Sequence, residues 1–285
     1  MKKPVIGYIY SGKKLGDDEI IFRRLAKKKK VELVMFNIFK DIEEKEFEEK
    51  LKKCDIIFNN TAVDYAIEIV KSMEELGKKV IDSSSKYYYI EDKWIFFLAC
   101  KKNKIPTPET ILLSEDLNLA EKELNEFNRW PVILKRVEGC SGEFVEKANN
   151  IKEALKTIKH LWKKGSERLP IIAQEFIPSS NYRVLLIDGK IVQTTIRKST
   201  HWKATGAWAG DMKKFPIDKN LKKIINKVME VTKIKVCGID LMKKGDKWLV
   251  LEVNSEPTFG FFDNEREKII NQVLNFLLRS IKKKR

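Results

Sequence analysis

The chain has 285 residues and a formal net charge of +16, from 57 Lys and Arg against 41 Asp and Glu. A hydrophobic content of 43% argues against disorder, and this length allows two or three lobes with buried cores. No apolar run approaches the length of a membrane span, and the first residues lack the hydrophobic segment of a signal peptide, so we expect a cytoplasmic protein without a membrane partner.

The positive charge is compatible with nucleic-acid binding, with an acidic partner or substrate, or with a lysine-rich proteome. Lysines are spread along the predicted helices, for example at 27–30 and 163–164, and the chain has no recognisable nucleic-acid-binding motif. Scattered lysines usually form solvated faces, so nucleic acid is not the expected partner. Such a field still favours anionic ligands.

Residues 5–82 alternate between short apolar segments and amphipathic segments. Strands are predicted at VIGYIY, VELVMF, CDIIF and KKVID, with a helix between each successive pair. This βαβαβαβ order predicts a parallel sheet with helices on its faces. A dinucleotide site is poorly supported, because SGKKLGDD follows the first strand in place of Gly-x-Gly-x-x-Gly. Substrates bind beyond the strand ends of such sheets, but the sequence does not show which substrate.

Lys93 lies in the first turn of a helix that is predicted to begin at Glu91-Asp92 and to end before Pro106. A cation in the first turn opposes the helix dipole, which is explained if the ammonium group points at an anion. Because lysine is abundant throughout the chain, the position carries little weight alone.

A Gly-rich turn at 138–142 is predicted to join a strand at Val132–Arg136 to a returning strand at 144–147. This strand–loop–strand order differs from the strand–loop–helix of a P-loop. The turn can still bring backbone N–H groups onto phosphates, next to a point charge on the preceding strand, through Gly139, Ser141, Gly142 and Lys135. Taken alone, the segment is slightly better explained as an ordinary hairpin turn.

A second hairpin, formed by YRVLLID and KIVQTTIR, turns at Asp188-Gly189. Its strands carry Arg183 and Arg197, and arginines beside carboxylates can clamp a phosphate or carboxylate with two hydrogen bonds. The polar segment KSTHWKATGAWAGD that follows is interpreted as a substrate loop. The other predicted elements are a strand at 171–177 and helices at 151–164, 221–232 and 266–281.

The segment from Gly238 to Asn254 is predicted to form a third hairpin. If its turn is centred on Asp246, Asp240 lies directly opposite Glu252. Like charges placed opposite each other destabilise paired strands by up to roughly 1 kcal/mol, so a cation between them explains the arrangement.

Regular alternation gives the second strand of this hairpin two faces, Leu249, Leu251 and Val253 on one and Trp248, Val250, Glu252 and Asn254 on the other. Two carboxylates and an amide oxygen form an all-oxygen set that suits Mg²⁺ and leaves room for waters and phosphate oxygens. The alternative interpretation is the solvated face of a strand. In this chain such a face should carry lysines, which here are confined to the turn.

These motifs occur in an order that resembles the ATP-grasp superfamily, in particular its RimK-like branch of carboxylate–amine ligases. They are Asp92-Lys93, the strand lysine with its Gly-rich turn, QEFI at 174–177, the arginine hairpin, GIDL at 238–241 and LEVN at 251–254. The resemblance covers essentially the whole chain. RKSTHW at 197–202 is similar to a stretch of LysX-type enzymes, which join an amino acid to the C-terminal glutamate of a small acidic carrier protein.

The resemblance implies an α/β protein with an ATP-grasp fold and an N-terminal parallel-sheet pre-ATP-grasp lobe. It implies a division into an N-terminal lobe at 1–90, a central lobe with the Gly-rich loop at 91–172, and a C-terminal lobe with the metal site at 173–285.

The resemblance also implies roles for individual residues, and it makes ATP and Mg²⁺ the cofactors, with two ions expected and Mn²⁺ as the alternative. Lys93 and Lys135 would contact the phosphates of ATP. Glu175 and Phe176 would contact the adenine, and Asn181 and Lys203 would lie near the nucleotide. The catalytic candidates, which would bind the transferred phosphoryl group or the acyl phosphate, are Arg183 and Arg197. The metal ligands would be Asp240, Glu252 and Asn254.

Several positions depart from the pattern of these relatives. Asn181 replaces the usual aspartate, and Arg136 replaces a common proline. In the substrate loop, Thr205 and Trp208 stand where asparagine and arginine are usual, and residues 258–260 read Thr-Phe-Gly where LysX-type enzymes have Glu-Phe-Lys. The nucleotide and metal end is therefore nearly intact, whereas the acceptor end is altered.

We therefore expect an ATP-dependent ligase that forms an amide through an acyl phosphate, with an amino acid and a small acidic carrier protein or peptide as partners, in a homo-oligomer. One alternative is a glutamate ligase acting on a small molecule or on a ribosomal protein terminus. Another is a non-catalytic relative that binds nucleotides or nucleic acid, which the lysine excess and the altered loop motivate.

Overall fold

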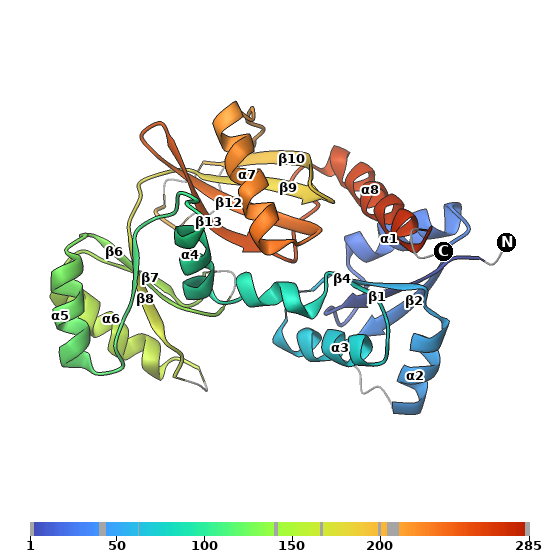
Figure 1. The fold of residues 1–285 in the computed structure, drawn as a ribbon, viewed down its shortest axis with the longest axis horizontal. Coiled ribbons are helices and arrows are strands. Elements are labelled where there is room, and N and C mark those ends of the chain that lie inside the picture. Colours follow the sequence, from blue (N-terminus) through green and yellow to red (C-terminus); the bar gives the residue numbers. More distant parts are fainter. Residues whose placement is uncertain are drawn as a thin grey trace.

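The computed structural model describes residues 3–39, 44–61, 63–139, 142–165, 168–198, 201–203 and 211–282. These residues form three sheets arranged in a row along the long axis of the molecule (Figure 1). The predictions for Ser141, Thr205 and Trp208 lie outside the described residues. None of the described helices is long and apolar enough to cross a membrane.

The N-terminal sheet has the strand order β2-β1-β3-β4, and its neighbouring strands are all parallel, which confirms the predicted βαβαβαβ arrangement. Its elements are β1 (Val5–Tyr10), α1 (Asp17–Lys28), β2 (Glu32–Asn37), α2 (Glu44–Lys53), β3 (Ile56–Asn59), α3 (Asp64–Glu75), β4 (Val80–Ile81) and a 3-10 helix, η1 (Ser84–Tyr89). The central strands β1 and β3 are buried along their whole length, as expected for a sheet covered on both faces.

The central sheet is antiparallel, with the order β5-β8-β6-β7. Its elements are β5 (Thr110–Leu112), α5 (Leu117–Phe127), β6 (Val132–Arg136), β7 (Val145–Ala148), α6 (Ile151–Lys163) and β8 (Ile171–Glu175). Helices α5 and α6 pack on one face of this sheet. β5 and α5 are not among the predicted elements, although Asp116 caps α5 by accepting hydrogen bonds from the backbone of Asn118 and Leu119.

The C-terminal sheet is also antiparallel and has the order β11-β10-β9-β12-β13. Its strands are β9 (Asn181–Ile187), β10 (Lys190–Arg197), β11 (Met212–Lys213), β12 (Val236–Lys244) and β13 (Lys247–Asn254). Two helices, α4 (Lys93–Lys102) and α7 (Lys219–Thr232), cover one face. The β9–β10 turn is confirmed, with Asp188 and Gly189 both at positive φ.

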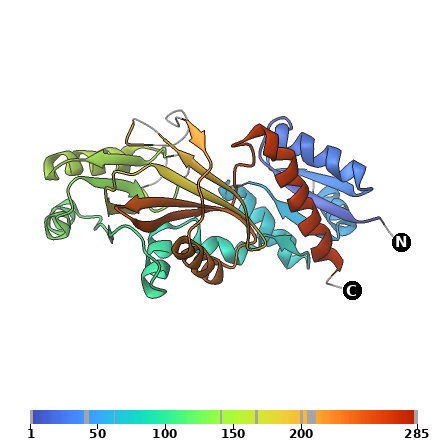
Figure 2. The ribbon, with the colours of Figure 1, turned by 90° about the horizontal axis from the view of Figure 1, so that it is seen from above.

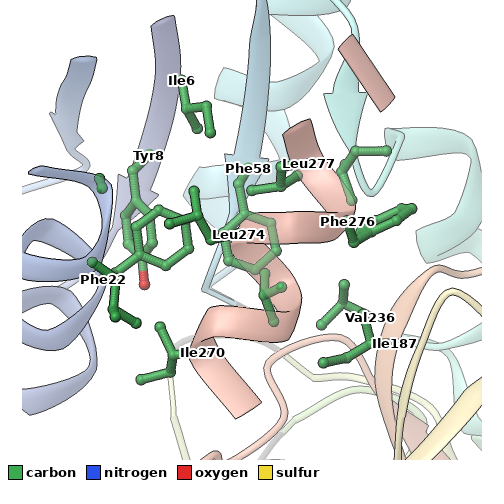
Figure 3. Packing of buried hydrophobic residues seen from close by; sticks show 14 of the residues in the cluster. Ile6, Tyr8, Phe22, Phe58, Ile187, Val236, Ile270, Leu274, Phe276 and Leu277 are labelled. Atoms are coloured by element: carbon green, nitrogen blue, oxygen red, sulfur yellow. The ribbon is translucent and has the colours of Figure 1, made fainter. Parts of the chain in front are cut away.

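The last helix, α8 (Asp263–Lys282), returns from the C-terminal sheet and packs against α1 and β3 of the N-terminal lobe (Figures 1 and 2). Figure 3 shows Leu274 and Leu277 of α8 beside Phe58, and Phe276 above Ile187 and Val236 of the C-terminal sheet. All six belong to one buried cluster, and each such side chain contributes about 1.5–3 kcal/mol by leaving water. The N-terminal lobe and the C-terminal sheet therefore share a hydrophobic core.

Candidate active site

Asp240 on β12 pairs directly with Glu252 on β13, as the sequence predicts. The turn, however, is not centred on Asp246 as expected, because Lys244 pairs with Lys247 across it. A regular register from that pair would place Asp240 opposite Leu251 instead of Glu252. A β-bulge next to the Asp240 pair supplies the missing residue. Bulges occur beside active sites because they re-aim side chains.

The same bulge shows that the predicted alternation of β13 is wrong. Val253 packs with Trp248 and Val250 in the core beneath α7, instead of lying on the face opposite to them. Glu252 and Asn254 therefore point to the other face of the sheet, where the Asp240 side chain lies. One extra residue in the strand brings together the three side chains that the sequence predicts as metal ligands.

Asp240 forms a paired interaction with Arg183 on the neighbouring strand β9. Its two carboxylate oxygens accept from Nε and Nη2 of Arg183, both at 2.6 Å, and Oδ2 also accepts from Nδ2 of Asn254 at 3.2 Å. Burial would raise the pKa of Asp240, but the arginine charges outweigh it and hold that pKa below its ordinary value. Asp240 is therefore an anion that the protein itself partly neutralises.

Arg197 on β10 lies next to this pair. Its Nε and Nη2 donate to Oδ1 of Asn181, at 3.1 and 2.5 Å, and its Nη2 lies 3.9 Å from Oδ1 of Asp240. The ring of Phe261 lies 5.6 Å from the guanidinium carbon of Arg183 and the same distance from that of Arg197. Both catalytic candidates therefore contact one aromatic ring and one carboxylate.

Glu252 has a different environment. Among the residues that the structure describes, its carboxylate makes no hydrogen bond and no ion pair, yet its charge acts on Arg183, Arg197 and Lys135. Lys135 is buried, and its ammonium donates to Oε1 of Gln174 at 3.0 Å. Burial lowers the pKa of Lys135 to about 8, an effect that Glu252 opposes and the nearby Lys93 reinforces.

The three oxygen-bearing side chains fit a magnesium ion that also binds phosphate. Arg183 and Asn254 fill three of the roughly four acceptor positions of the Asp240 carboxylate, so it retains about one. Both Glu252 oxygens and Oδ1 of Asn254 complete the set. In the described parts of the chain, no group of three or more His, Cys, Asp or Glu side chains is placed to hold a metal ion, so waters or phosphate oxygens would supply the remaining ligands.

Two of the three lysines predicted to approach the nucleotide hold the Gly-rich turn between β6 and β7. Lys93 donates to the carbonyl oxygen of Gly139 at 2.7 Å, and Lys203 donates to that of Gly142 at 3.0 Å. Both glycines have positive φ, which residues with side chains rarely adopt. The turn therefore lies against the cations that an incoming phosphate would use.

Glu175 and Phe176 lie at the end of β8, at the edge of this group. Glu175 accepts from the backbone N–H of Glu109 at 3.1 Å and from the Lys244 ammonium at 2.5 Å. The Phe176 ring faces the Lys147 ammonium, 4.7 Å from its centroid. The adenine-binding role of this pair stays a prediction.

Four further side chains join these groups and were not predicted, namely Lys147, Gln174, Trp202 and Phe261. Lys147 lies 6.0 Å from the Trp202 ring, which also faces Lys203 at 5.3 Å. Ile172 on β8 pairs with Lys135, and Gln174 lies two residues further along the same strand. Because alternate residues of a strand share a face, the sequence could have placed Gln174 beside Lys135. Nothing in the local sequence distinguishes Phe261 from the other aromatic residues of its loop.

Residues 90–277 match the RimK-like ATP-grasp domain. The chain is 27% identical over 223 residues to the "Coenzyme gamma-F420-2:alpha-L-glutamate ligase" of Methanocaldococcus jannaschii, which covers 74% of this chain and 75% of that protein. It is also 27% identical over 195 residues to the "Alpha-aminoadipate--LysW ligase LysX" of Saccharolobus solfataricus, covering 66% of this chain and 69% of that protein.

Solved structures share the fold. A D-alanine–D-alanine ligase from Bacillus anthracis complexed with ATP superposes with a TM-score of 0.75 at 17% identity, and the match covers 100% of both chains. The ATP-grasp ligase PsnB, complexed with a phosphomimetic variant of its minimal precursor, Mg and ADP, superposes with a TM-score of 0.67 at 14% identity, covering 97% of this chain and 99% of that chain.

Proposed function

Because this chain belongs to the RimK-like ATP-grasp family, we propose that it uses ATP to join an amino acid to a carboxylate of an acidic carrier protein or peptide, such as a C-terminal glutamate. The chain is an ATP-grasp ligase that forms carbon–nitrogen bonds. The observation that supports the site assignment best is Glu252, a carboxylate near three cations that makes no hydrogen bond to any described residue. A metal ion bound to ATP would give this carboxylate a partner.

In this proposal Asp240, Glu252 and Asn254 hold Mg²⁺, and Lys93 and Lys135 bind phosphate oxygens. When bound, the ion would neutralise negative charge on the β- and γ-phosphate oxygens of ATP. We propose that two ions bind and that Mn²⁺ can take the place of Mg²⁺. The Arg183–Asp240 pair makes the binding of a cation and an anion interdependent, because a ligand that attracts Arg183 releases oxygens of Asp240.

The proposed reaction has two steps. An oxygen of the acceptor carboxylate bonds to the γ-phosphorus of ATP while the bond to the bridging oxygen breaks, which releases ADP and leaves an acyl phosphate. The amine nitrogen of the amino acid then bonds to the acyl carbon, phosphate leaves with the electrons of the C–O bond, and the nitrogen loses a proton. Arg183 and Arg197 would stabilise the charge that develops on the transferred group.

The choice of acceptor rests on two observations. The first is a relative whose match covers 66% of this chain and whose name says that it ligates α-aminoadipate to LysW. The second is the net charge of +16, which would speed the encounter with an acidic partner. A second candidate, glutamate ligation to a small molecule, is favoured by the relative named as a coenzyme F420 glutamate ligase, which covers 74% of the chain.

The test combines purified protein, ATP and Mg²⁺ with a panel of amino acids, using either a glutamate-ending acidic peptide or a pterin or deazaflavin glutamate as acceptor. Released ADP and the mass of the product report the reaction and its acceptor. ATP binding without ADP release under any combination would identify a non-catalytic relative instead.

Glu252→Gln tests the site in the same assay. Loss of the metal-binding charge should lower the ligation rate by about 10²- to 10³-fold while the melting temperature stays near that of the wild type. Glu230→Gln, an exposed glutamate on α7, is the matched control and should keep full activity. Turnover in Glu252→Gln equal to that of the control would contradict the site assignment.

A further inference from the structure

A concave surface lies on the side of the C-terminal sheet opposite to the candidate active site. It is a cavity of about 470 Å³, and its lining includes Tyr182 and Ile196. Each of these residues directly precedes a catalytic candidate, Arg183 on β9 or Arg197 on β10, and therefore points to the opposite face. We call this surface the α7-face cavity, because it lies where α7 begins.

The floor of the α7-face cavity is aromatic. Tyr182 packs edge-to-face against Phe215 and Trp248, with ring centroids 5.1 and 4.9 Å apart. Phe215 and Trp248 also contact each other, at 5.7 Å. The three rings form a fixed apolar surface of the kind that anchors a side chain of a binding partner.

The rim of the cavity is positively charged. Lys198 and Lys213 are exposed, and neither ammonium group has an ion pair within the described ranges. Lys243 lies over the Trp248 ring, with its nitrogen 4.4 Å from the centroid. Among the described lining residues Asp218 is the one carboxylate, and its oxygens accept from Leu221 N–H and from Trp248 Nε1.

We propose that the α7-face cavity binds an acidic, partly apolar segment of the protein or peptide acceptor. This inference rests on the proposed function, which supplies an acidic acceptor. Glutamate or aspartate side chains of the segment would pair with the rim lysines, and an apolar side chain would lie on the aromatic floor. β11 is the edge strand of the sheet, so a chain that leaves the cavity across β11 reaches the opposite face beside Arg197.

The geometry favours a peptide over single-stranded RNA. Bases bind to proteins by stacking on open aromatic faces. Here Tyr182 packs edge-to-face against Phe215 and Trp248. The Lys243 ammonium also covers one face of the Trp248 ring. Trp248 is also buried, so the largest ring of the floor offers no open face for a base.

Binding is measured without ATP, by fluorescence anisotropy of a fluorescein-labelled peptide that contains several glutamates, one leucine and one phenylalanine. We expect binding that weakens as salt increases. Replacing the glutamates by glutamine should abolish it, and replacing the two apolar residues by serine should weaken it about tenfold.

The protein variant combines Lys198→Glu and Lys213→Glu, and the matched control combines Lys156→Glu and Lys159→Glu on the exposed face of α6. Both change the net charge equally, so an effect of the overall field is the same in each. We expect the cavity variant to lose about tenfold more affinity than the control. Equal losses, no binding of the acidic peptide, or tighter and competing binding of an oligouridine RNA would each overturn the proposal.

The two proposals fail separately. ADP formation and ligation with unchanged peptide affinity in the cavity variant would contradict only the docking site. Cavity-dependent peptide binding without ADP formation in the ligation assay would contradict only the proposed reaction.

Discussion

Phe261 is the residue that links the two arginines of the candidate active site. Arg183 and Arg197 are both positively charged, and both lie beside the Asp240 carboxylate. Burial lowers the pKa of Arg197, and the charge of Arg183 lowers it further. The Phe261 ring lies 5.6 Å from both guanidinium carbons, where its electron-rich face attracts cations. The ring therefore helps to hold two cations close together in the absence of an anionic ligand.

Phe261→Leu should lower the ligation rate while leaving ATP affinity nearly unchanged. Loss of the cation–π contacts lets the arginines move, and if one contact of about 0.5–2 kcal/mol is lost in the transition state, kcat should fall about 3- to 30-fold. Steady-state kinetics measures kcat and the KM for ATP separately. Phe262→Leu is the matched control, because its ring contacts Lys214 instead of the arginines. A similar loss in both variants would show that the loop, and not the Phe261 ring, determines the rate.

At the scale of elements, Arg136 ties the Gly-rich turn to helix α6. It stands at the end of β6 and is buried. Its guanidinium lies 4.0 Å from the Phe144 ring centroid at the far end of the turn, and its Nη2 donates to the carbonyl oxygens of Leu161, at 2.7 Å, and Lys164. Lys164 in turn donates to the carbonyl oxygen of Glu143 at 2.7 Å. The turn is therefore anchored on the side away from the active-site lysines.

Arg136→Met should weaken both the fold and nucleotide binding. The substitution keeps an apolar side chain but removes a charged hydrogen-bond donor and a cation–π contact, so we expect a loss of about 2–4 kcal/mol in unfolding free energy. ATP affinity should fall as well, because the turn is no longer fixed. Denaturant titration and calorimetric ATP binding measure the two effects, with the exposed Arg129→Met as the control. Unchanged ATP affinity in a destabilised Arg136→Met protein would limit this arginine to a structural role.

The elements with local signals could be predicted from the sequence, and those set by distant contacts could not. Asp188-Gly189 fixes a hairpin because both residues take positive φ, and the position of the Gly-rich turn follows in the same way. The bulge in β13 has no such signal, since its register depends on the packing of Val253 beneath α7. The contact of Phe261 with the arginines likewise depends on where its loop lies, and this follows from the docking of α8.

At the scale of the whole molecule, the N-terminal lobe is fixed to the C-terminal sheet by polar contacts as well as by the shared core. The Asp82 carboxylate, just after β4, accepts from the backbone N–H of Lys235 at 2.8 and 2.9 Å and from that of Val236 at 3.0 Å. Arg266 of α8 pairs with Asp18 at 2.6 Å and with Asp17 at 2.9 Å. The C-terminal sheet and the N-terminal lobe thus form one support for the face of the sheet that carries the candidate active site.

Asp82 should make the stability of this support depend on pH. Burial raises the pKa of Asp82 to about 6, although the hydrogen bonds from Val236 and Lys235 lower it. In the unfolded chain an aspartate has a pKa of about 3.9, so between about pH 4 and pH 6 the folded state binds more protons than the unfolded state. The contribution of Asp82 to the unfolding free energy therefore falls as the pH rises through this window, by about 3 kcal/mol in total.

Asp82→Asn isolates this effect, because asparagine keeps an acceptor oxygen and does not titrate. Urea denaturation of both proteins between pH 4 and pH 7 gives the difference in unfolding free energy at each pH, in which the titration of all other groups cancels. We expect the wild type to lose stability relative to Asp82→Asn as the pH rises from about 4 to about 6, with no further relative change above that. A constant difference across the window would mean that Asp82 ionises in the folded protein as it does in the unfolded chain. The hydrogen bonds from Lys235 and Val236 would then offset the whole cost of burying its charge.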